Sequence, residues 1–351
     1  MTSFHIGDRP VGDGAPVFVI AEAGVNHNGA IDLAFDLVDA AKMAGADAVK
    51  FQTFDPDLLA SPEAPKAAYQ AEATAAAESQ LEMLRRLALG RQDFARIAER
   101  CAARELLFLS TPFDAGSADL LDGLDMPAFK MPSGELTNHP LFAHVAAKGK
   151  PMIVSTGMAD MDEIAAALKI IADAGGLKPA LLHCVSAYPA APEDMNLKAM
   201  QTMRAAFGVP VGFSDHSDGI EVPIAAAALG ADIIEKHMTL DNALPGPDHR
   251  ASIEPEVFTR MVEDIRTVEA ALGDGIKRPQ PAELEIAAIA RRSVVALTDI
   301  SEGAEISASM VAIKRPGTGL APAQLDTVIG ARAAHPINAG APITADMIEI
   351  H

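Results

Sequence analysis

Two neighbouring stretches of the chain end apolar runs on charged residues and a histidine. They read GFSDHSDG at residues 212–219 and ADIIEKHMTL at residues 231–240. Each begins with apolar residues typical of a buried strand and then places a histidine, His216 or His237, where the strand should end. Burying charged groups without partners is costly, so polar ends on adjacent strands indicate a shared functional pocket.

Six further apolar runs of the same kind recur along the chain, separated by alanine-rich segments with helical spacing. Alternating strands and helices predict a parallel sheet covered by helices. Eight such units in roughly 250 residues predict a (β/α)8 TIM barrel. An open doubly wound sheet is the alternative, but the first turn, EAGVNHNGA, lacks the GxGxxG phosphate motif. The eight runs begin at Val17, Ala48, Leu106, Ala128, Pro151, Ala180, Val211 and Asp232.

The pattern changes after LGDGIKRPQPAE (residues 272–283), which is rich in Gly, Pro and charge. We therefore expect a barrel domain over 1–275, a linker over 276–290 and a small domain over 291–351. The last part contains an internal repeat. The stretches DISEGAEISASMV (299–311) and PINAGAPITADMI (336–348) share the pattern I-x-x-G-A-x-I-[ST]-A-x-M. The repeat predicts a pseudo-symmetric module built around a β-turn and a short helix.

The composition limits the classes of partner. The formal net charge is −20, so the chain should repel nucleic acid and anionic membrane surfaces. Its two cysteines, Cys101 and Cys184, form no paired motif. We also find no secretory signal and no apolar run of the ~20 residues that a membrane span needs. These features predict a cytoplasmic protein.

In a barrel of this kind the active site lies at the carboxyl ends of the strands. Every predicted strand turns polar at that end, which predicts a pocket there. The polar residues at these ends, besides the two histidines, are Glu22, Lys50, Gln52, Thr111, Lys130, Ser133, Glu135, Ser155, Ser186, Tyr188, Ser214 and Glu235.

The residue types suggest a metal and an anion. Neutral imidazole is a good ligand for divalent metals, and two protein ligands leave positions open for substrate. The alternative is that His216 and His237 are hydrogen-bonded core residues. Lys50 and Lys130 could hold a phosphate and a carboxylate. A Schiff base with a carbonyl substrate, or structural pairing with neighbouring glutamates, remains open.

Two further residues lie outside the strands. Asp248 belongs to the loop LPGPDHRAS (244–252), which could be an exposed loop or a lid over the pocket. Arg315 stands beside a Pro-Gly turn in KRPGTG (314–319), where it could contact an acidic or polyhydroxylated ligand or simply be solvated.

These motifs resemble the sialic acid synthase family. The resemblance rests on FVIAEAGVNHNG (18–29), AGADAVKFQTF (44–54), FKMPSGELTN (129–138), GFSDHS, EKHMTL and GPDH. The tail DISEGAEISASMVAIKRPGTGL (299–320) is similar to the antifreeze-like (SAF) domain of that family. The resemblance implies condensation of phosphoenolpyruvate with an N-acetylmannosamine-type sugar, which gives a nonulosonic acid and phosphate. It also implies a divalent metal, usually Mn²⁺, and a domain-swapped homodimer.

The resemblance also implies roles for particular residues. His216 and His237 would hold the metal, with Glu135 near the metal and its waters, and Arg315 would reach over the partner's pocket. Phosphoenolpyruvate would be bound by Lys50, Thr111, Lys130, Ser133, Ser155 and Ser214. The sugar would be oriented by Glu22, Gln52, Tyr188, Asp248 and Arg315, with Ser186 nearby.

Two positions depart from some relatives. Ala73 in YQAEATAAAE and Ser186 in CVSAYP stand where those relatives have asparagine. N-acetylmannosamine and the 2,4-diacetamido-6-deoxymannose of the legionaminic acid route therefore both remain possible substrates, whereas the motifs look less like the pseudaminic branch. A lysine Schiff-base aldolase and a non-enzymatic sugar-binding protein are the alternative functions.

Overall fold

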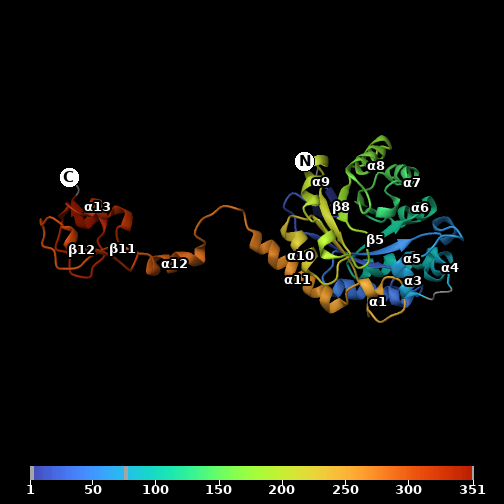
Figure 1. Cartoon of the computed structure of the whole chain (residues 1–351), viewed down its shortest axis with the longest axis horizontal. Coiled ribbons are helices and arrows are strands. Elements are labelled where there is room, and N and C mark those ends of the chain that lie inside the picture. The colour runs from blue at the N-terminus through green and yellow to red at the C-terminus, as the bar shows by residue number, and fades with distance from the viewer. Residues whose placement is uncertain (1–3, 75–77, 350–351) are drawn as a thin grey trace. The chain divides into compact units, whose positions relative to one another are not determined.

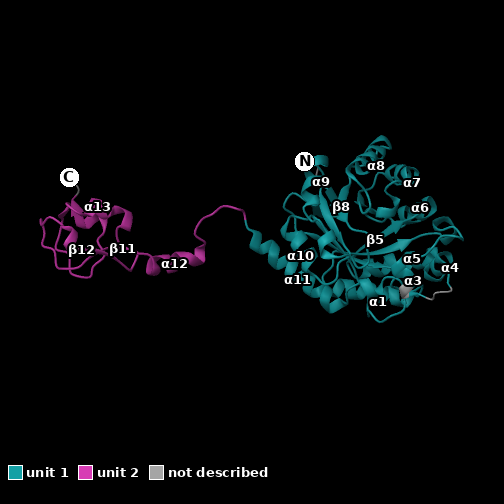
Figure 2. Cartoon of the chain, viewed as in Figure 1, with its two compact units in different colours: residues 1–273 teal, residues 274–351 magenta. Residues whose placement is uncertain are grey.

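The structure, a computed structural model, describes residues 4–74 and 78–349, without the side chains of residues 72 and 73. The chain divides into two compact units, Met1–Gly273 and Asp274–His351 (Figure 2). Each unit has a hydrophobic core of its own, so each is described separately.

The first unit is built on eight parallel strands, ordered β5-β4-β3-β10-β9-β8-β7-β6. β5 and β6, at the two ends of this order, lie against one another, so the sheet is a nearly closed barrel with helices around it (Figure 1). The predicted (β/α)8 barrel is confirmed, and every predicted run contains a strand. The strands are β3 (Phe18–Gly24), β4 (Ala48–Thr53), β5 (Leu107–Pro112), β6 (Phe129–Met131), β7 (Met152–Ser155), β8 (Ala180–Cys184), β9 (Val211–Asp215) and β10 (Ile233–His237).

Several helices begin at a residue whose side chain caps the first turn. At the start of α8, for example, the Asp160 carboxylate accepts bonds from the backbone N–H groups of Asp162 and Glu163.

Within the described residues, no helix is both long and apolar enough to span a bilayer. The helices of this unit are α1 (Ile31–Met43), α2 (Pro56–Leu59), α3 (Ala68–Ala73), α4 (Gln80–Leu87), α5 (Arg91–Ala103), α6 (Ala115–Gly123), α7 (His139–Ala146), α8 (Met161–Asp173), α9 (Ala199–Phe207), α10 (Glu221–Ala228) and α11 (Pro255–Leu272), with short 3-10 helices η1 (Ser133–Glu135), η2 (Pro192–Asp194) and η3 (His249–Ala251).

A short hairpin at the amino terminus, which the sequence did not predict, lies at the far end of the barrel from the pocket. It pairs β1 (Phe4–Ile6) with β2 (Arg9–Val11). Its Gly7 lies beside Leu107, the first residue of β5, and Gly12 beside Pro210, directly before β9. The hairpin therefore covers the amino ends of the strands and leaves the carboxyl ends for the site.

The second unit shows the predicted pseudo-symmetry. Ile300 and Ile337, equivalent residues of the two repeats, exchange backbone N–H···O bonds of 2.8 and 2.9 Å. Each repeat also ends in a 3-10 helix followed by a strand. The elements are α12 (Pro281–Ala290), β11 (Ser293–Ala296), η4 (Ala308–Met310), β12 (Val311–Lys314), η5 (Pro322–Gln324), α13 (Leu325–Val328), β13 (Arg332–Ala333), η6 (Ala345–Met347) and β14 (Ile348–Glu349).

The stretch expected as a linker contains the helix α12. The backbone N–H of Gly317 donates to the carbonyl of Ala288 at 2.8 Å. The end of this helix is therefore bonded to the turn after β12, within the second unit. No residue of α12 is buried, although the helix carries Leu284, Ile286 and Ile289.

A buried ion pair aligns β9 with β10, the two strands that carry the histidines. Asp215 and Lys236 are register partners, and their charged atoms are 2.6 Å apart with both side chains fully buried. Close approach of the same strands requires Gly212, because a Cβ there would lie 2.3 Å from the carbonyl oxygen of Ile233. Side chains alternate along a strand, so Lys236 faces away from the pocket while Glu235 and His237 face into it.

We expect Lys236→Met to lower the free energy of unfolding of the barrel by about 3–5 kcal/mol, because it leaves the Asp215 carboxylate buried without its partner. Urea denaturation followed by circular dichroism measures this loss. The control is Lys169→Met, which removes an exposed pair with Asp173 and should change stability little. Replacing both buried partners, with Asp215→Leu and Lys236→Met together, should recover part of the loss. Equal effects of the two lysine variants would contradict the role given to the buried pair.

Candidate functional site

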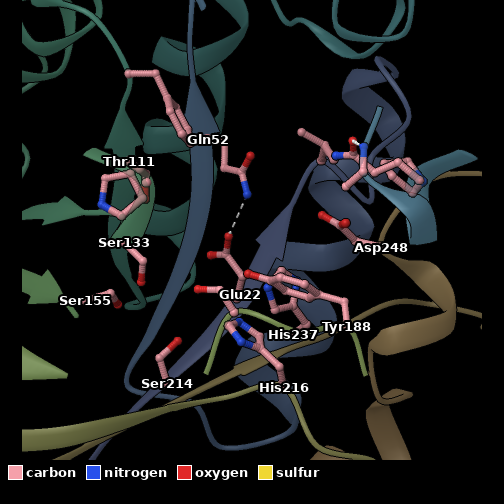
Figure 3. Close-up of a pocket in the computed structure, with 18 of the residues that line it drawn as sticks. Glu22, Gln52, Thr111, Ser133, Ser155, Tyr188, Ser214, His216, His237 and Asp248 are labelled. Atoms are coloured by element: carbon pink, nitrogen blue, oxygen red, sulfur yellow. Dashed lines mark hydrogen bonds between the residues drawn. The ribbon is translucent and has the colours of Figure 1, made fainter. Parts of the chain in front are cut away.

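A pocket of about 430 Å³ opens at the carboxyl ends of the barrel strands (Figure 3). It lies where the polar strand ends predicted it, and every predicted site residue lines it except Glu135 and Arg315. The predicted residues that line it are Glu22, Lys50, Gln52, Thr111, Lys130, Ser133, Ser155, Ser186, Tyr188, Ser214, His216, His237 and Asp248.

Four buried charges form the floor of the pocket. Lys50 Nζ lies 2.6 Å from Glu22 Oε2 and 3.7 Å from Glu235 Oε2, and Lys130 Nζ lies 3.3 Å from Glu235 Oε1. None of the four residues is more than 4% exposed. Two ammonium groups and two carboxylates thus compensate one another, which is the condition for keeping charges in a buried site.

The four groups differ in how readily they hold a proton. Burial opposes ionisation of Glu235, but Lys130 and Lys50 outweigh it and lower the pKa of this carboxyl to about 2. Burial and the nearby Glu235 instead raise the pKa of Glu22 above its ordinary value, despite Lys50. Burial disfavours the charged form of Lys50, yet Glu22 and Glu235 raise its pKa overall, whereas burial lowers the pKa of Lys130. Glu22 is therefore the carboxyl that most easily takes up a proton here.

Glu235 was predicted from the sequence as a strand-end residue and a possible partner of a lysine, but it was given no role in the site. It pairs with both lysines and also accepts a 2.9 Å bond from Ser214 Oγ. Its place in strand β10, two residues before His237, could have indicated this, because alternate residues of a strand share a face.

Hydroxyl groups surround the two lysines. Thr111 Oγ1 accepts a bond from Lys50 Nζ at 3.2 Å, and Ser133 Oγ accepts one from the N–H of Gly157 at 2.9 Å. Ser155 Oγ is buried and has no hydrogen-bond partner among the described residues. These groups come from the ends of different strands, so barrel closure brings them together beside the ammonium groups.

The two histidine rings lie side by side, with centroids 5.4 Å apart. His216 Nδ1 lies 2.7 Å from the carbonyl oxygen of Val185, and a bond donated there leaves Nε2 free to accept. His237 Nδ1 is buried without a partner in the described part of the chain, and burial lowers the pKa of this ring well below its ordinary value. Burial opposes the charged form of His216, but Cys184 and the bond to Val185 raise the pKa of this ring above its ordinary value. No group of three or more His, Cys, Asp or Glu placed to hold a metal occurs among the described residues.

Aromatic rings form one wall of the pocket. The Tyr188 ring lies 4.1 Å from that of His216 and meets that of His237 edge-on at 6.0 Å (centroid distances). Tyr69, from α3, also stacks on the Tyr188 ring, with centroids 4.9 Å apart. Tyr69 was not predicted as a site residue, although it begins the YQAEATAAAE segment that was singled out for Ala73. The side chain of Ala73 itself lies outside the described residues.

Asp248 lies at the edge of the pocket on a bonded loop. Its backbone carbonyl accepts a 2.6 Å bond from Ser252 Oγ, which in turn accepts one from Asn26 Nδ2 at 2.9 Å. The same amide group donates to the carbonyl of Met238, directly after β10. Burial raises the pKa of the Asp248 carboxyl to about 6. The backbone at Asp248 is therefore fixed by hydrogen bonds, and its carboxyl changes charge at about pH 6.

Two predicted residues lie elsewhere. Glu135, on η1, accepts a 2.6 Å bond from Asn138 Nδ2 and is not among the residues that line the pocket. Arg315 belongs to the second unit, where it is exposed and its Nε donates to the carbonyl of Ala290 at 2.9 Å.

Comparisons with known proteins agree with the fold and the motifs. The NeuB family model matches residues 37–277, and the SAF domain model matches residues 291–349. The N,N'-diacetyllegionaminic acid synthase of Legionella pneumophila is 45% identical over 347 residues, which cover 98% of each protein. The human N-acetylneuraminate-9-phosphate synthase is 32% identical over 347 residues, 98% of this chain and 96% of the relative.

Solved structures give the same result. The N-acetylneuraminic acid synthetase of Leptospira borgpetersenii superposes with a TM-score of 0.72 at 34% identity, over 81% of this chain and 95% of that one. The spore coat polysaccharide biosynthesis protein SpsE of Bacillus subtilis has a TM-score of 0.68 at 36% identity and full coverage of both chains. The chain therefore belongs to the NeuB family, whose members include legionaminic and sialic acid synthases, and carries a C-terminal SAF domain.

Proposed function

We propose that the barrel condenses phosphoenolpyruvate with an N-acylated mannosamine-type sugar to give a nonulosonic acid and phosphate. The observation that carries the proposal is the two-sided pocket. Buried lysines and hydroxyl groups lie on one side, and a pair of imidazoles with Gln52, Tyr188 and Asp248 lies on the other. The names of the relatives, which are legionaminic and neuraminate synthases, support the same reaction class.

The lysine side suits a small, highly charged anion. Lys50 and Lys130 supply positive charge, and the hydroxyls of Thr111, Ser133 and Ser155 supply directed hydrogen bonds for a phosphate and a carboxylate. In the absence of that anion, Glu22 and Glu235 balance the lysines. The site can therefore keep its ammonium groups buried and charged before substrate arrives. The structure of the Leptospira relative was solved in complex with citrate, which is also a carboxylate anion.

The opposite side suits a polyhydroxylated substrate. The Asp248 carboxylate can accept hydrogen bonds from hydroxyl and amide groups, the Gln52 amide can both accept and donate them, and Tyr188 and Ser186 line the same pocket. In the reaction, C3 of phosphoenolpyruvate bonds to the aldehyde carbon of the open-chain sugar, water adds at C2, and phosphate leaves. Glu22, with its raised pKa, is placed to hold or return a proton in these steps.

A divalent cation fits the two histidines, because His237 Nδ1 is buried without a described partner and His216 presents Nε2. We propose that His216 and His237 hold Mn²⁺. When bound, such a cation polarises the aldehyde oxygen of the sugar. Glu135 is bonded to Asn138, so any part it plays near the metal would require that bond to be exchanged.

The sugar that we propose first is the 2,4-diacetamido-6-deoxymannose of the legionaminic acid route. Relatives named for that product are 45% and 44% identical to this chain, against 32% for the human neuraminate-9-phosphate synthase. N-acetylmannosamine is the second candidate. We place the reaction in the cytoplasm.

The test is a phosphate-release assay with phosphoenolpyruvate, Mn²⁺ and a panel of N-acylated hexosamines. The proposal predicts release with at least one mannosamine-type sugar and loss of release after chelation. The alternative rests on Lys130, whose pKa is lowered by burial, acting as a Schiff-base amine. Chelator-insensitive turnover together with borohydride trapping of pyruvate would establish that aldolase instead. Absence of phosphate release with every sugar would favour a binding protein.

His237→Ala should lower both Mn²⁺ affinity and phosphate release by about 100-fold or more, since even outer-shell partners of a metal ligand are worth 10–100-fold. Isothermal titration with Mn²⁺ measures the first effect, and the barrel should remain folded by circular dichroism. The control is His144→Ala, which removes a surface histidine paired with Asp119. Unchanged Mn²⁺ affinity in His237→Ala would refute the metal assignment.

The raised pKa of Asp248 predicts a pH dependence. Protonation below about pH 6 removes the carboxylate that would bind the sugar, so the KM for the sugar should rise as the pH falls through this value.

The same carboxyl should also affect stability. The folded barrel holds this proton more tightly than the unfolded chain does, so ionisation of the carboxyl lowers the free energy of unfolding as the pH rises from 3.8 to about 6. Asp248→Asn should therefore give a high, pH-independent KM and a higher melting temperature at pH 7. A variant that kept the wild-type pH profile would contradict this assignment.

We further propose that two protomers exchange their second domains, so that Arg315 of one protomer completes the pocket of the other. We take the barrel as residues 1–275, the connection as 276–290 and the second domain as 291–351. The support is α12, whose Leu284, Ile286 and Ile289 are 59%, 63% and 70% exposed. A helix that exposes several large apolar side chains is expected to be covered by another surface.

Mixing two inactive variants tests this exchange. His237→Ala and Arg315→Ala should each be nearly inactive alone. Unfolded and refolded together in equal amounts, they should regain about a quarter of wild-type activity, because half the dimers are mixed and each mixed dimer has one intact pocket. Each variant refolded alone is the control. No recovery from a mixture shown to contain mixed dimers would contradict the exchange.

A further inference from the structure

We propose that Tyr69 is a positioning residue that fixes α3 over the pocket and holds Tyr188 in place for the sugar. This inference rests on the proposed function, because it assigns Tyr188 and Asp248 to the sugar side. Three aromatic rings, those of Tyr69, Tyr188 and His216, contact one another in sequence. Tyr69 stacks on Tyr188 with centroids 4.9 Å apart and planes 27° apart, and Tyr188 in turn lies 4.1 Å from His216.

Tyr69 links its own segment to the barrel, because it stacks on Tyr188, which follows strand β8. Residues 61–71 are exposed or half-buried, and none of them is buried in a hydrophobic core. Among the described side chains of α3, Tyr69 and Gln70 line the pocket, and Gln70 Nε2 donates to the Tyr69 hydroxyl at 3.3 Å. A segment with so little buried apolar surface is held locally by few interactions, so loss of one aromatic stack should loosen it.

The same stack restricts Tyr188. This ring contacts both His216 and Tyr69, and both tyrosines lie within the electrostatic reach of Asp248. Without Tyr69 the Tyr188 ring would lose one of these two aromatic contacts, and it could turn away from the sugar. The lysines that would hold phosphoenolpyruvate stand on strands β4 and β6 and do not depend on this stack.

These relations predict a separation of kinetic effects. Tyr69→Ala should raise the KM for the sugar about tenfold, because loss of an aromatic contact costs roughly 1.4 kcal/mol and this free energy corresponds to a factor of ten. The KM for phosphoenolpyruvate should stay within about twofold of the wild-type value. Tyr69→Phe keeps the ring and should behave like the wild type. The matched control is Leu58→Ala, which removes an exposed apolar side chain from α2 in the same β4–α5 insertion.

Hydrogen exchange supplies a readout that does not need activity. In the full-length protein without substrates, Tyr69→Ala should speed amide exchange over residues 61–71 while the barrel strands keep wild-type protection. Tyr69→Phe and Leu58→Ala should leave exchange in this segment unchanged. Added N-acetylmannosamine should slow exchange in the wild-type segment and have little effect in Tyr69→Ala.

The two measurements separate the two proposals. If the wild type releases no phosphate with any sugar, the proposed function fails, and exchange over residues 61–71 in the absence of sugar still decides whether Tyr69 orders α3. If the wild type is active, the inference requires both the KM effect and the exchange effect. A Tyr69→Ala enzyme with wild-type KM for the sugar, or with wild-type exchange in this segment, would overturn it.

Discussion

Two lysines buried at the mouth of a barrel are stable only if negative charge is brought to them, and the site is organised around this constraint. Lys50 and Lys130 stand on different strands, and Glu22 and Glu235 come from two others. Closure of the sheet is what brings these four carboxyl-end residues together. The result is a compensated cluster that can receive a small anion with little rearrangement, because the positive charges and the hydroxyl groups around them are already in place.

Strand β10 contributes to both sides of the pocket. It supplies Glu235 to the charged cluster around the lysines and His237 to the pair of imidazoles. Glu235 and His237 face the pocket from β10, while Lys236 between them pairs with Asp215 on the outside. A shift of one residue between β9 and β10 would reverse these directions and place the lysine in the pocket. The outer ion pair and the close approach at Gly212 therefore fix the inner site, although neither touches a substrate.

The sequence was informative where local pattern decides structure. Apolar runs with polar ends predicted all eight barrel strands, and the residues at those ends include most of the pocket lining. The amino-terminal hairpin was missed because its strands have three residues each and carry no clear period. Tyr69 was missed because its role depends on contact with Tyr188, far along the chain, which no local pattern reveals. Glu135 ends a short 3-10 helix after β6, and its carboxylate is bonded to Asn138 and is not among the residues that line the pocket, a contact that no local pattern reveals.

We propose that one pocket holds a divalent cation at His216 and His237 and an anion at Lys50 and Lys130 at the same time. The decisive measurement is diffraction from crystals grown with Mn²⁺ and phosphoenolpyruvate, recorded at the manganese absorption edge. We expect an anomalous peak within bonding distance of both imidazoles and phosphate density beside both lysines. Imidazoles turned away from each other, with no metal peak between them and no anion at the lysines, would contradict it.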